Sequence, residues 1–218
     1  MKVISVLNHK GGVGKSTFAT NICAYYANKG NNVLLGDFDV QQSSYNWNML
    51  RPSSVPQIEI MEFEENGSPK KPKNNIDYVV IDSPAGIRSD ALHRLVYMSD
   101  KIITPIKPSS FDILSTGTFL EEISEIIEEI YIEKNKFVDL CLVGNMIEGR
   151  TLSSENLHQF IKKTGIYHPL SLRQSQVYVN LTAYGLSIFD SQNVLFNPDK
   201  KAWEPLFDWI DNNNNNQE

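Results

Sequence analysis

The residues with the clearest chemical meaning lie near the N-terminus. The stretch reads Lys10-Gly11-Gly12-Val13-Gly14-Lys15-Ser16-Thr17. Glycines let successive backbone N–H groups turn toward a phosphate, and a following helix N-terminus adds positive potential. Lys15 is placed to bring a point charge to the β- and γ-phosphates, and the Ser16 hydroxyl is placed to bind Mg²⁺. Residues 11–17 therefore predict a site for a nucleoside triphosphate.

This stretch departs at one position from the usual phosphate-loop pattern, G-x-x-x-x-G-K-[ST]. The pattern requires glycine at position 9, where the chain has His9. The remaining G-G-x-G-K-S stands beside a second lysine, Lys10. Average residue frequencies give such a match a chance of roughly 10⁻³ in a chain of this length. A glycine turn between surface lysines is the alternative.

Three aspartates follow apolar runs and could serve the same phosphate. Asp37 and Asp39 come after the run 33–35, and Asp82 ends the run 79–81. Open α/β sheets bind ligands at the carboxyl ends of their strands, where carboxylates can hold Mg²⁺ or orient water. Turn formation at strand ends is the alternative role.

The elements that must position these residues alternate along the chain. Apolar runs predict strands at 3–7, 33–35, 58–63, 79–81, 102–106 and 140–143, and helices are expected near 17–29, 88–98, 112–134, 153–164 and 202–210. Alternating strands and helices imply right-handed βαβ units. The expected fold is α/β, a doubly wound, mostly parallel sheet flanked by helices, of the P-loop NTPase type. Residues 1–211 are expected to form one domain and 212–218 a polar tail, with an exposed loop at 64–75.

Composition narrows the function classes. The 218 residues carry a formal charge of −6, which argues against a protein coated in basic charge for nucleic acid but permits a local basic patch. The two cysteines, Cys23 and Cys141, and the four histidines show no metal-ligand spacing. No apolar run reaches the ~20 residues of a membrane-spanning helix. We expect a soluble cytoplasmic protein.

The loop with a lysine ahead of its paired glycines resembles the deviant Walker A loop of the ParA/MinD family of ATPases. Further segments match that family in order: 34–43 its switch I, 77–86 its Walker B strand and switch II, and 99–109, 173–178 and 185–189 its later elements. The likeness is greatest to the short ParA-type partition ATPases without an N-terminal DNA-binding extension. Gly36, Val40 and Ala85 depart from the usual family residues without removing a ligand.

This resemblance implies a role for each matching residue. Catalytic roles fall to Lys15, to Asp39, which would orient the attacking water, and to Lys10, which would reach the phosphates of a partner subunit. Mg²⁺ would be held by Ser16, Asp37 and Asp82. Asn145 resembles the asparagine that reads adenine, although an ordinary turn asparagine is the alternative.

The implied activity is a Mg²⁺-dependent ATPase that dimerises on binding ATP, binds nonspecific DNA and partitions plasmid or chromosomal DNA with a ParB-like partner. It would be cytoplasmic and associated with the nucleoid, with no membrane contact. The family binds DNA through C-terminal basic residues, for which Arg173, Lys200 and Lys201 are the candidates; ordinary solvated side chains are the alternative.

Other functions on the same fold remain open. A relative could move a protein cargo, such as a microcompartment, over the nucleoid. A metabolic ATP-dependent enzyme is a second class, but an iron–sulphur reductase needs cysteines at a dimer axis, and Cys23 and Cys141 lie in the wrong elements. A membrane-bound division regulator is disfavoured because the terminal helix carries Glu204, Asp208 and Asp211. We interpret that helix as packed in the core.

Overall fold

The computed structural model describes residues 1–64, 69–149 and 151–212. Its strands are β1 (Lys2–Val6), β2 (Val33–Asp37), β3 (Glu59–Ile60), β4 (Tyr78–Asp82), β5 (Lys101–Ile106), β6 (Asp139–Ile147) and β7 (Tyr167–Arg173). They form a seven-stranded sheet in the order β3-β2-β4-β1-β5-β6-β7, and all neighbouring pairs are parallel. The predicted mostly parallel sheet is confirmed. The strand predicted at 58–63 is shorter than expected, because only Glu59 and Ile60 pair with β2.

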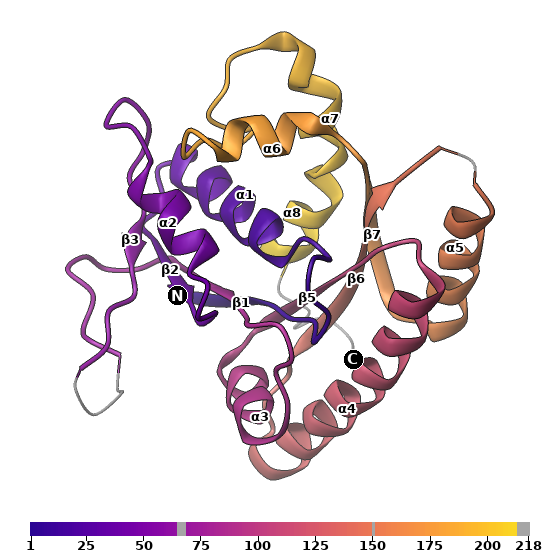
Figure 1. Ribbon diagram of the computed structural model, residues 1–218. Coiled ribbons are helices and arrows are strands. Elements are labelled where there is room, and N and C mark those ends of the chain that lie inside the picture. The colour runs from indigo at the N-terminus through magenta and orange to yellow at the C-terminus, as the bar shows by residue number, and fades with distance from the viewer. Residues whose placement is uncertain (65–68, 150, 213–218) are drawn as a thin grey trace.

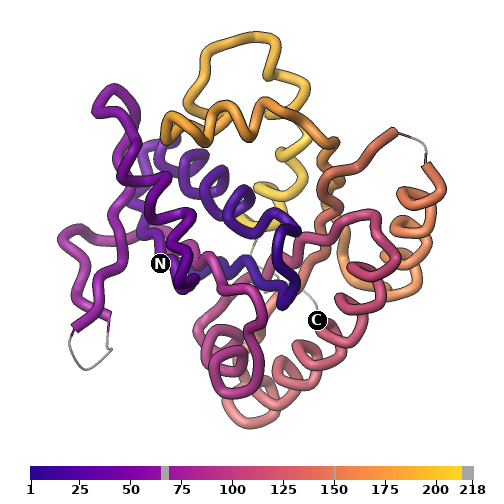
Figure 2. Tube along the Cα trace, viewed as in Figure 1, coloured from indigo at the N-terminus to yellow at the C-terminus, as the bar shows by residue number. Residues whose placement is uncertain are grey.

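Helices cover both faces of this sheet (Figure 1). One face carries α1 (Lys15–Asn28), α2 (Ser43–Met49), α6 (Gln176–Thr182), α7 (Asn197–Ala202) and α8 (Glu204–Asp211). The other carries α3 (Ser89–Met98), α4 (Ser110–Lys134) and α5 (Leu152–Thr164). Figure 2 shows the chain from α6 to α7, which includes the 3₁₀ helix η1 (Val194–Phe196), arching above α6 at the top of the view.

The strands are apolar on both sides because both sheet faces are covered. In β1, Ile4 and Val6 join the core formed with α1 and α8, whereas Val3 joins the core formed with α3 and α4. This double burial explains why the strand runs lack the polar alternation of a half-exposed sheet. The strand order places the carboxyl ends of β1, β2 and β4 side by side, because β4 pairs in parallel with both β1 and β2.

The C-terminal helix differs from the prediction in one respect. The apolar stripe expected over 202–210 is divided at Trp203, where α7 ends, and α8 begins with a proline in its first turn. Proline lacks the N–H that a continuous helix would need there. Leu206, Phe207 and Ile210 are buried, which confirms the core interpretation of the stripe. Within the described residues, no helix is long and apolar enough to span a membrane.

Lysines at the amino ends of the strands hold the end of α8. The Lys2 ammonium donates to the Ile210 carbonyl at 2.6 Å, and that of Lys101 donates to the Asn212 carbonyl at 2.9 Å. The hydroxyls of Tyr26 and Tyr78 both donate to Asp211 Oδ1, at 2.8 and 3.0 Å. Cations near the last carbonyls of a helix complement its dipole. These contacts fix α8 against the sheet.

A buried ion pair joins the end of α2 to the loop after α6. Arg51 Nη2 lies 2.8 Å from Asp190 Oδ1, and both side chains are fully buried. The guanidinium also donates to the carbonyls of Pro56 and Gly185. Burial alone would raise the pKa of Asp190. The hydrogen bonds from Arg51 and the positive charge of Arg51 outweigh this effect and hold the pKa of Asp190 below its usual value. A side chain at Gly185 would meet the Leu50 carbonyl carbon at 2.4 Å, so the two segments are in close contact.

Breaking this pair from one side should be costly. Arg51→Met leaves the Asp190 carboxylate buried without its cation, and we expect the free energy of unfolding to fall by about 3–5 kcal/mol. Urea denaturation measures the loss. The double variant Arg51→Met/Asp190→Leu should recover most of it, because no isolated charge is left inside. A single-variant loss no larger than that of a surface arginine such as Arg94→Met would contradict the interpretation.

Candidate nucleotide-binding site

The loop between β1 and α1 has the backbone geometry of a phosphate cradle. Gly12 and Gly14 have φ of +69° and +100°, in the region that favours glycine. A Cβ at Gly14 would lie 2.1 Å from Asn145 Nδ2, so no larger residue fits. The loop leads directly into α1, whose first residue is Lys15. The backbone amides of this loop and the N-terminus of α1 are suited to a phosphate, and this role stays a prediction.

Lys15 is held beneath this loop. It is buried, and its ammonium donates to the carbonyl of Lys10 at 2.9 Å. Burial lowers the pKa of Lys15, while the charges of Asp82 and Asp39 act in the opposite direction. An incoming phosphate would strengthen the charged form and give the ammonium a better partner than a carbonyl.

Lys10 stands at the entrance to the loop. Its backbone N–H donates to Asn8 Oδ1 at 2.9 Å, and Asn8 is itself fixed by donating to the Pro105 carbonyl and to Thr116. Among the described residues, no hydrogen bond or ion pair involves the Lys10 ammonium. The backbone of this residue is thus fixed while its charge remains available to a ligand.

Asp82 is an acidic residue buried inside the site. It is 1% exposed, and neither carboxylate oxygen has a hydrogen-bond partner among the described residues. Burial raises the pKa of Asp82 to about 6, and the nearby Ser16 and Ser44 hydroxyls and Lys15 only partly offset this effect. An unpartnered buried carboxylate beside a hydroxyl fits a divalent cation, because Mg²⁺ binds through few carboxylates and takes its other ligands from water and phosphate. The surroundings of Asp82 thus fit the predicted magnesium site, and the roles of Ser16 and Asp82 as ligands stay a prediction.

Asp37 has other partners here. Its Oδ1 accepts the Asp39 N–H at 3.0 Å, and its Oδ2 accepts the N–H groups of Ser44 and Tyr45 at 3.0 and 2.9 Å. These bonds satisfy donors at the start of α2, as a capping side chain does. Asp37 therefore ties the switch I segment to α2. Its role as a magnesium ligand stays a prediction.

Asp39 links switch I to switch II. Its Oδ2 accepts the Ala85 N–H at 3.2 Å, and its Oδ1 accepts the Gln41 N–H at 2.9 Å. The Phe38 N–H donates to the Asp82 carbonyl nearby. The carboxylate that would orient water is therefore held between the segments that follow β2 and β4. The structure brings it together with Lys15 and Asp82.

A pocket beside the glycine loop is large enough for a nucleoside. It has a volume of about 300 Å³ and is lined by Thr17, Asn145, Met146, Arg173, Gln174, Ser175, Gln176, Tyr178, Val179 and Thr182. Asn145 lies inside β6, not in a turn after a strand, and its Nδ2 donates to the Val13 carbonyl at 2.8 Å. Asn145 therefore supports the loop from the side of this pocket; its contact with adenine stays a prediction.

Sequence reasoning missed the segment Gln174–Gln176, which lines the same pocket. The signal was present, because residues 173–178 match a family element, but that element was assigned to DNA through Arg173 alone. The Arg173 guanidinium donates two hydrogen bonds of 2.9 Å to Asp199, and the Asp199 carboxylate partly offsets the charge of Arg173. That these residues lie beside Thr17 and Asn145 was not visible in the sequence, because it depends on how β7 and α6 pack against the loop.

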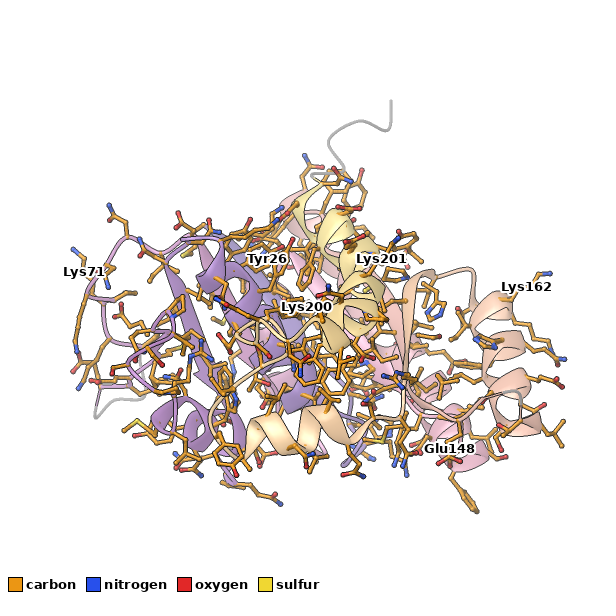
Figure 3. The ribbon with its side chains drawn as sticks, turned by 90° about the horizontal axis from the view of Figure 1, so that it is seen from above. Tyr26, Lys71, Glu148, Lys162, Lys200 and Lys201 are labelled. Carbon is orange, nitrogen blue, oxygen red and sulfur yellow. The ribbon has the colours of Figure 1, made fainter. Side chains whose placement is uncertain are left out.

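The other basic candidates lie on α7. The Lys200 ammonium donates to the Ser191 carbonyl at 2.5 Å, and Lys201 is exposed. Figure 3 shows both near the middle of the view, with Lys71 and Lys162 toward its opposite ends. The four lysines therefore do not form a compact cluster.

The two carboxylates of the site should respond oppositely to amidation. The raised pKa of Asp82 means that ionisation costs stability as pH rises past the unfolded value of about 3.9 and through the folded value. Without ligands, Asp82→Asn should therefore raise the free energy of unfolding at about pH 8 by about 2–3 kcal/mol, with the gain shrinking toward about pH 4. Asp37→Asn should destabilise, because Asp37 accepts three backbone N–H groups. Urea denaturation across pH measures both; destabilisation by Asp82→Asn would contradict an unpartnered carboxylate.

Two named proteins are similar in sequence to most of this chain. The "Maintenance of carboxysome distribution protein A" of Halothiobacillus neapolitanus is 28% identical over 191 residues, covering 85% of this chain and 86% of the relative. The sporulation initiation inhibitor protein Soj of Bacillus subtilis is 23% identical over 208 residues, covering 74% and 79%. Each of the two similarities extends over most of this chain and most of the relative.

Solved structures resemble the fold. A putative plasmid partition protein of Borrelia burgdorferi bound to AMPPNP matches with a TM-score of 0.71 at 17% identity, covering 95% of this chain and 99% of the other. Apo McdA of Cyanothece matches with a TM-score of 0.72 at 14% identity, covering 95% and 98%. At these identities the likeness concerns architecture. The predicted doubly wound fold of the P-loop NTPase type is confirmed.

A family model covers the site itself. The model for the CobQ/CobB/MinD/ParA nucleotide binding domain matches residues 4–182, from β1 to the end of α6. This range contains the glycine loop, both switch segments and Asn145. The predicted membership is confirmed: the chain belongs to the CobQ/CobB/MinD/ParA family of nucleotide-binding domains.

Proposed function

We propose that this chain is a ParA-type, Mg²⁺-dependent ATPase that dimerises on binding ATP, binds nonspecific DNA in the cytoplasm at the nucleoid, and partitions or positions a cargo. The observation that carries the proposal is the buried, unpartnered Asp82 beside Lys15 and beneath the glycine loop. Such a pair is costly unless a phosphate and a cation complete it. The ATP- and AMPPNP-bound states named for structural neighbours support this ligand.

In this proposal each side chain has a separate task. Lys15 and the loop amides bind the β- and γ-phosphates, and Ser16 and Asp82 hold Mg²⁺, which would offset charge on the transferred phosphoryl group when bound. Asp39 orients the attacking water from the junction of the two switch segments. Hydrolysis then depends on positioning and electrostatics, with no covalent step on the protein.

Lys10 supplies the link to dimerisation. Its backbone is fixed through Asn8, while its ammonium has no described partner. A charge presented at the edge of the loop can reach a triphosphate held by a second copy. ATP would then form part of the interface between two subunits.

The cargo has two candidates. Relatives named for partition and for sporulation control support DNA moved with a ParB-like partner. The relatives named for carboxysome distribution support a protein cargo equally well. Tracking a labelled test plasmid in cells with and without this chain separates the two, because only a DNA-partition system changes plasmid inheritance.

Metabolic enzymes on this fold are less well supported. Cobyrinic acid a,c-diamide synthase of Mycobacterium smegmatis shares the fold with a TM-score of 0.58, whereas the named relatives in sequence are distribution, sporulation and ParA proteins. The reductase alternative needs cysteines that reach a partner subunit, whereas Cys23 and Cys141 are both fully buried.

Asp39→Ala and Lys10→Ala should fail at different steps. Asp39→Ala keeps the ligands of ATP, so it should bind ATP, lose hydrolysis by about 10²-fold or more, and accumulate as a dimer. Lys10→Ala should keep nucleotide binding through Lys15 and the loop amides but stay monomeric. Light scattering with Mg·ATP measures the assembly.

The double variant orders the two steps. It should behave as Lys10→Ala, since a dimer that never forms cannot be trapped. If Lys10→Ala dimerises like the wild type, the sandwich-dimer mechanism is wrong. Lys15→Ala serves as the control that should lose ATP binding altogether.

The proposed DNA contacts can be ranked by their partners. Arg173 is paired with Asp199 and Lys200 donates to a carbonyl, so Lys201 should carry the largest share. Lys201→Ala should flatten the log–log salt dependence of DNA binding by about one unit, and Arg173→Ala by less. Gel shifts on random DNA with Mg·ATP measure this. Lys162→Ala, on α5, is the matched control; an equal effect there would place the DNA face elsewhere.

A further inference from the structure

His9 stands at the position where this chain departs from the usual phosphate-loop pattern. That pattern has glycine there, and no step of the proposed function uses the histidine. A side chain at this position needs space beside the loop. In this structure the His9 ring lies against α4, the helix on the face of the sheet opposite α1 (Figure 1). The departure is therefore a packed feature of the fold.

Two side chains one turn apart on α4 hold the His9 ring. Its Nε2 lies 2.5 Å from Ser115 Oγ, and its ring centroid lies 5.1 Å from that of Phe119. Phe119 is buried and belongs to the apolar core on this face. The His9 Nδ1 is also buried and has no partner among the described residues. Within that part of the chain, Ser115 is thus the one hydrogen-bond partner that orients the ring.

The backbone of His9 bonds to switch II. The Gly86 N–H donates to the His9 carbonyl at 2.7 Å. The N–H one residue earlier, that of Ala85, donates to Asp39 Oδ2 at 3.2 Å. Gly86 has a φ of +75°, which lets the chain turn sharply between these two bonds. Residues 85 and 86 are therefore held between the glycine loop and the carboxylate that is proposed to orient water.

The charge state of the ring suits a fixed contact. Burial lowers the pKa of His9, and the positive charge of Arg88 acts in the same direction. The charges of Lys10 and Lys15 add to this effect, and Glu122 opposes it. A doubly protonated ring would carry two N–H donors, and no acceptor among the described residues lies at Nδ1. The ring is therefore neutral near neutral pH and keeps one hydrogen bond, to Ser115.

The residue before His9 forms a separate link to the same helix. Asn8 Nδ2 donates to Thr116 Oγ1 at 3.2 Å, and Asn8 Oδ1 accepts the Lys10 N–H at 2.9 Å. Asn8 thus fixes the backbone of Lys10, whereas the His9 carbonyl fixes Gly86. Two adjacent residues docked on α4 hold different parts of the site, so their effects can be separated by experiment.

We propose that His9 is a positioning residue for ATP hydrolysis, which holds Gly86 through its carbonyl and thereby sets the place of Asp39. The inference rests on the proposed function, in which Asp39 orients the attacking water. Without the ring, the backbone at this position is no longer tied to α4, and a shift of Gly86 reaches Asp39 through Ala85. Because phosphoryl transfer depends on positioning, the effect falls on turnover and not on the groups that bind ATP.

The kinetics of two variants test this role. His9→Ala should lower kcat for ATP hydrolysis about tenfold and change the KM for ATP by less than about twofold. His9→Gln should stay within about twofold of the wild-type kcat, because its amide can reach Ser115. In light scattering with Mg·ATP, His9→Ala should still dimerise, because Asn8 continues to fix Lys10. An unchanged kcat, a loss carried by KM, equal losses in both variants, or a monomeric His9→Ala would each overturn the inference.

Ser115 tests the same contact from α4. Ser115→Ala should lower kcat about threefold or more, and the double variant His9→Ala/Ser115→Ala should be no slower than His9→Ala, since both changes remove one interaction. Ser124→Ala, at an exposed position on the same helix, is the matched control and should hydrolyse ATP like the wild type. Losses that multiply in the double variant would show that the two residues act separately, and the inference would be wrong.

Amide exchange distinguishes this inference from the proposed function. In the nucleotide-free protein, the Gly86 N–H should exchange about fivefold faster or more in His9→Ala than in the wild type, with His9→Gln like the wild type. Nuclear magnetic resonance measures this single amide. If the wild type does not hydrolyse ATP, the proposed function fails, while exchange still decides whether His9 holds switch II. Equal Gly86 exchange in the wild type and His9→Ala contradicts the inference whatever the turnover.

Discussion

The candidate site depends on two opposite charges that are held inside the protein without either being fully satisfied. Lys15, at the start of α1, and Asp82, at the end of β4, are both buried, so little water reaches their charges. Lys15 has only a carbonyl as its hydrogen-bond partner, and Asp82 has none among the described residues. Buried charges of this kind cost stability and are retained where a ligand completes them. The rest of the fold must therefore be rigid enough to hold them.

That rigidity comes from asparagine and glycine as much as from the apolar core. Asn8 fixes the backbone of Lys10 from below, and Asn145 supports the loop from β6. Gly14 can approach Asn145 closely only because it lacks a side chain. Both side chains are buried, so their hydrogen bonds have little competition from water. The cradle is preorganised before any phosphate arrives.

A continuous set of contacts leads from the phosphate site to the face that carries α6 and α7. Asp37 caps α2, and the end of α2 is anchored by the Arg51–Asp190 pair to the loop after α6. On the other side of the same segment, Phe38 lines a pocket of about 550 Å³ together with residues of α3. A change in this segment therefore bears on two surfaces at once.

Much of this molecule is determined locally, and the rest depends on distant parts of the chain meeting. Residue spacing predicts the glycine–lysine loop, the strand that ends at Asp82 and the long helices at 110–134 and 152–164. It can do so because periodicity and glycine conformation are local properties. The pairing of Arg173 with Asp199, the capping of α2 by Asp37 and the position of Asn145 inside β6 could not be predicted, since each depends on which neighbour occupies the available space. The same is true of the Arg51–Asp190 ion pair, whose members are far apart in the sequence. Residue types alone determined which chemistry is available; only the tertiary structure decided which charges are already paired, because pairing and burial are set by packing between elements.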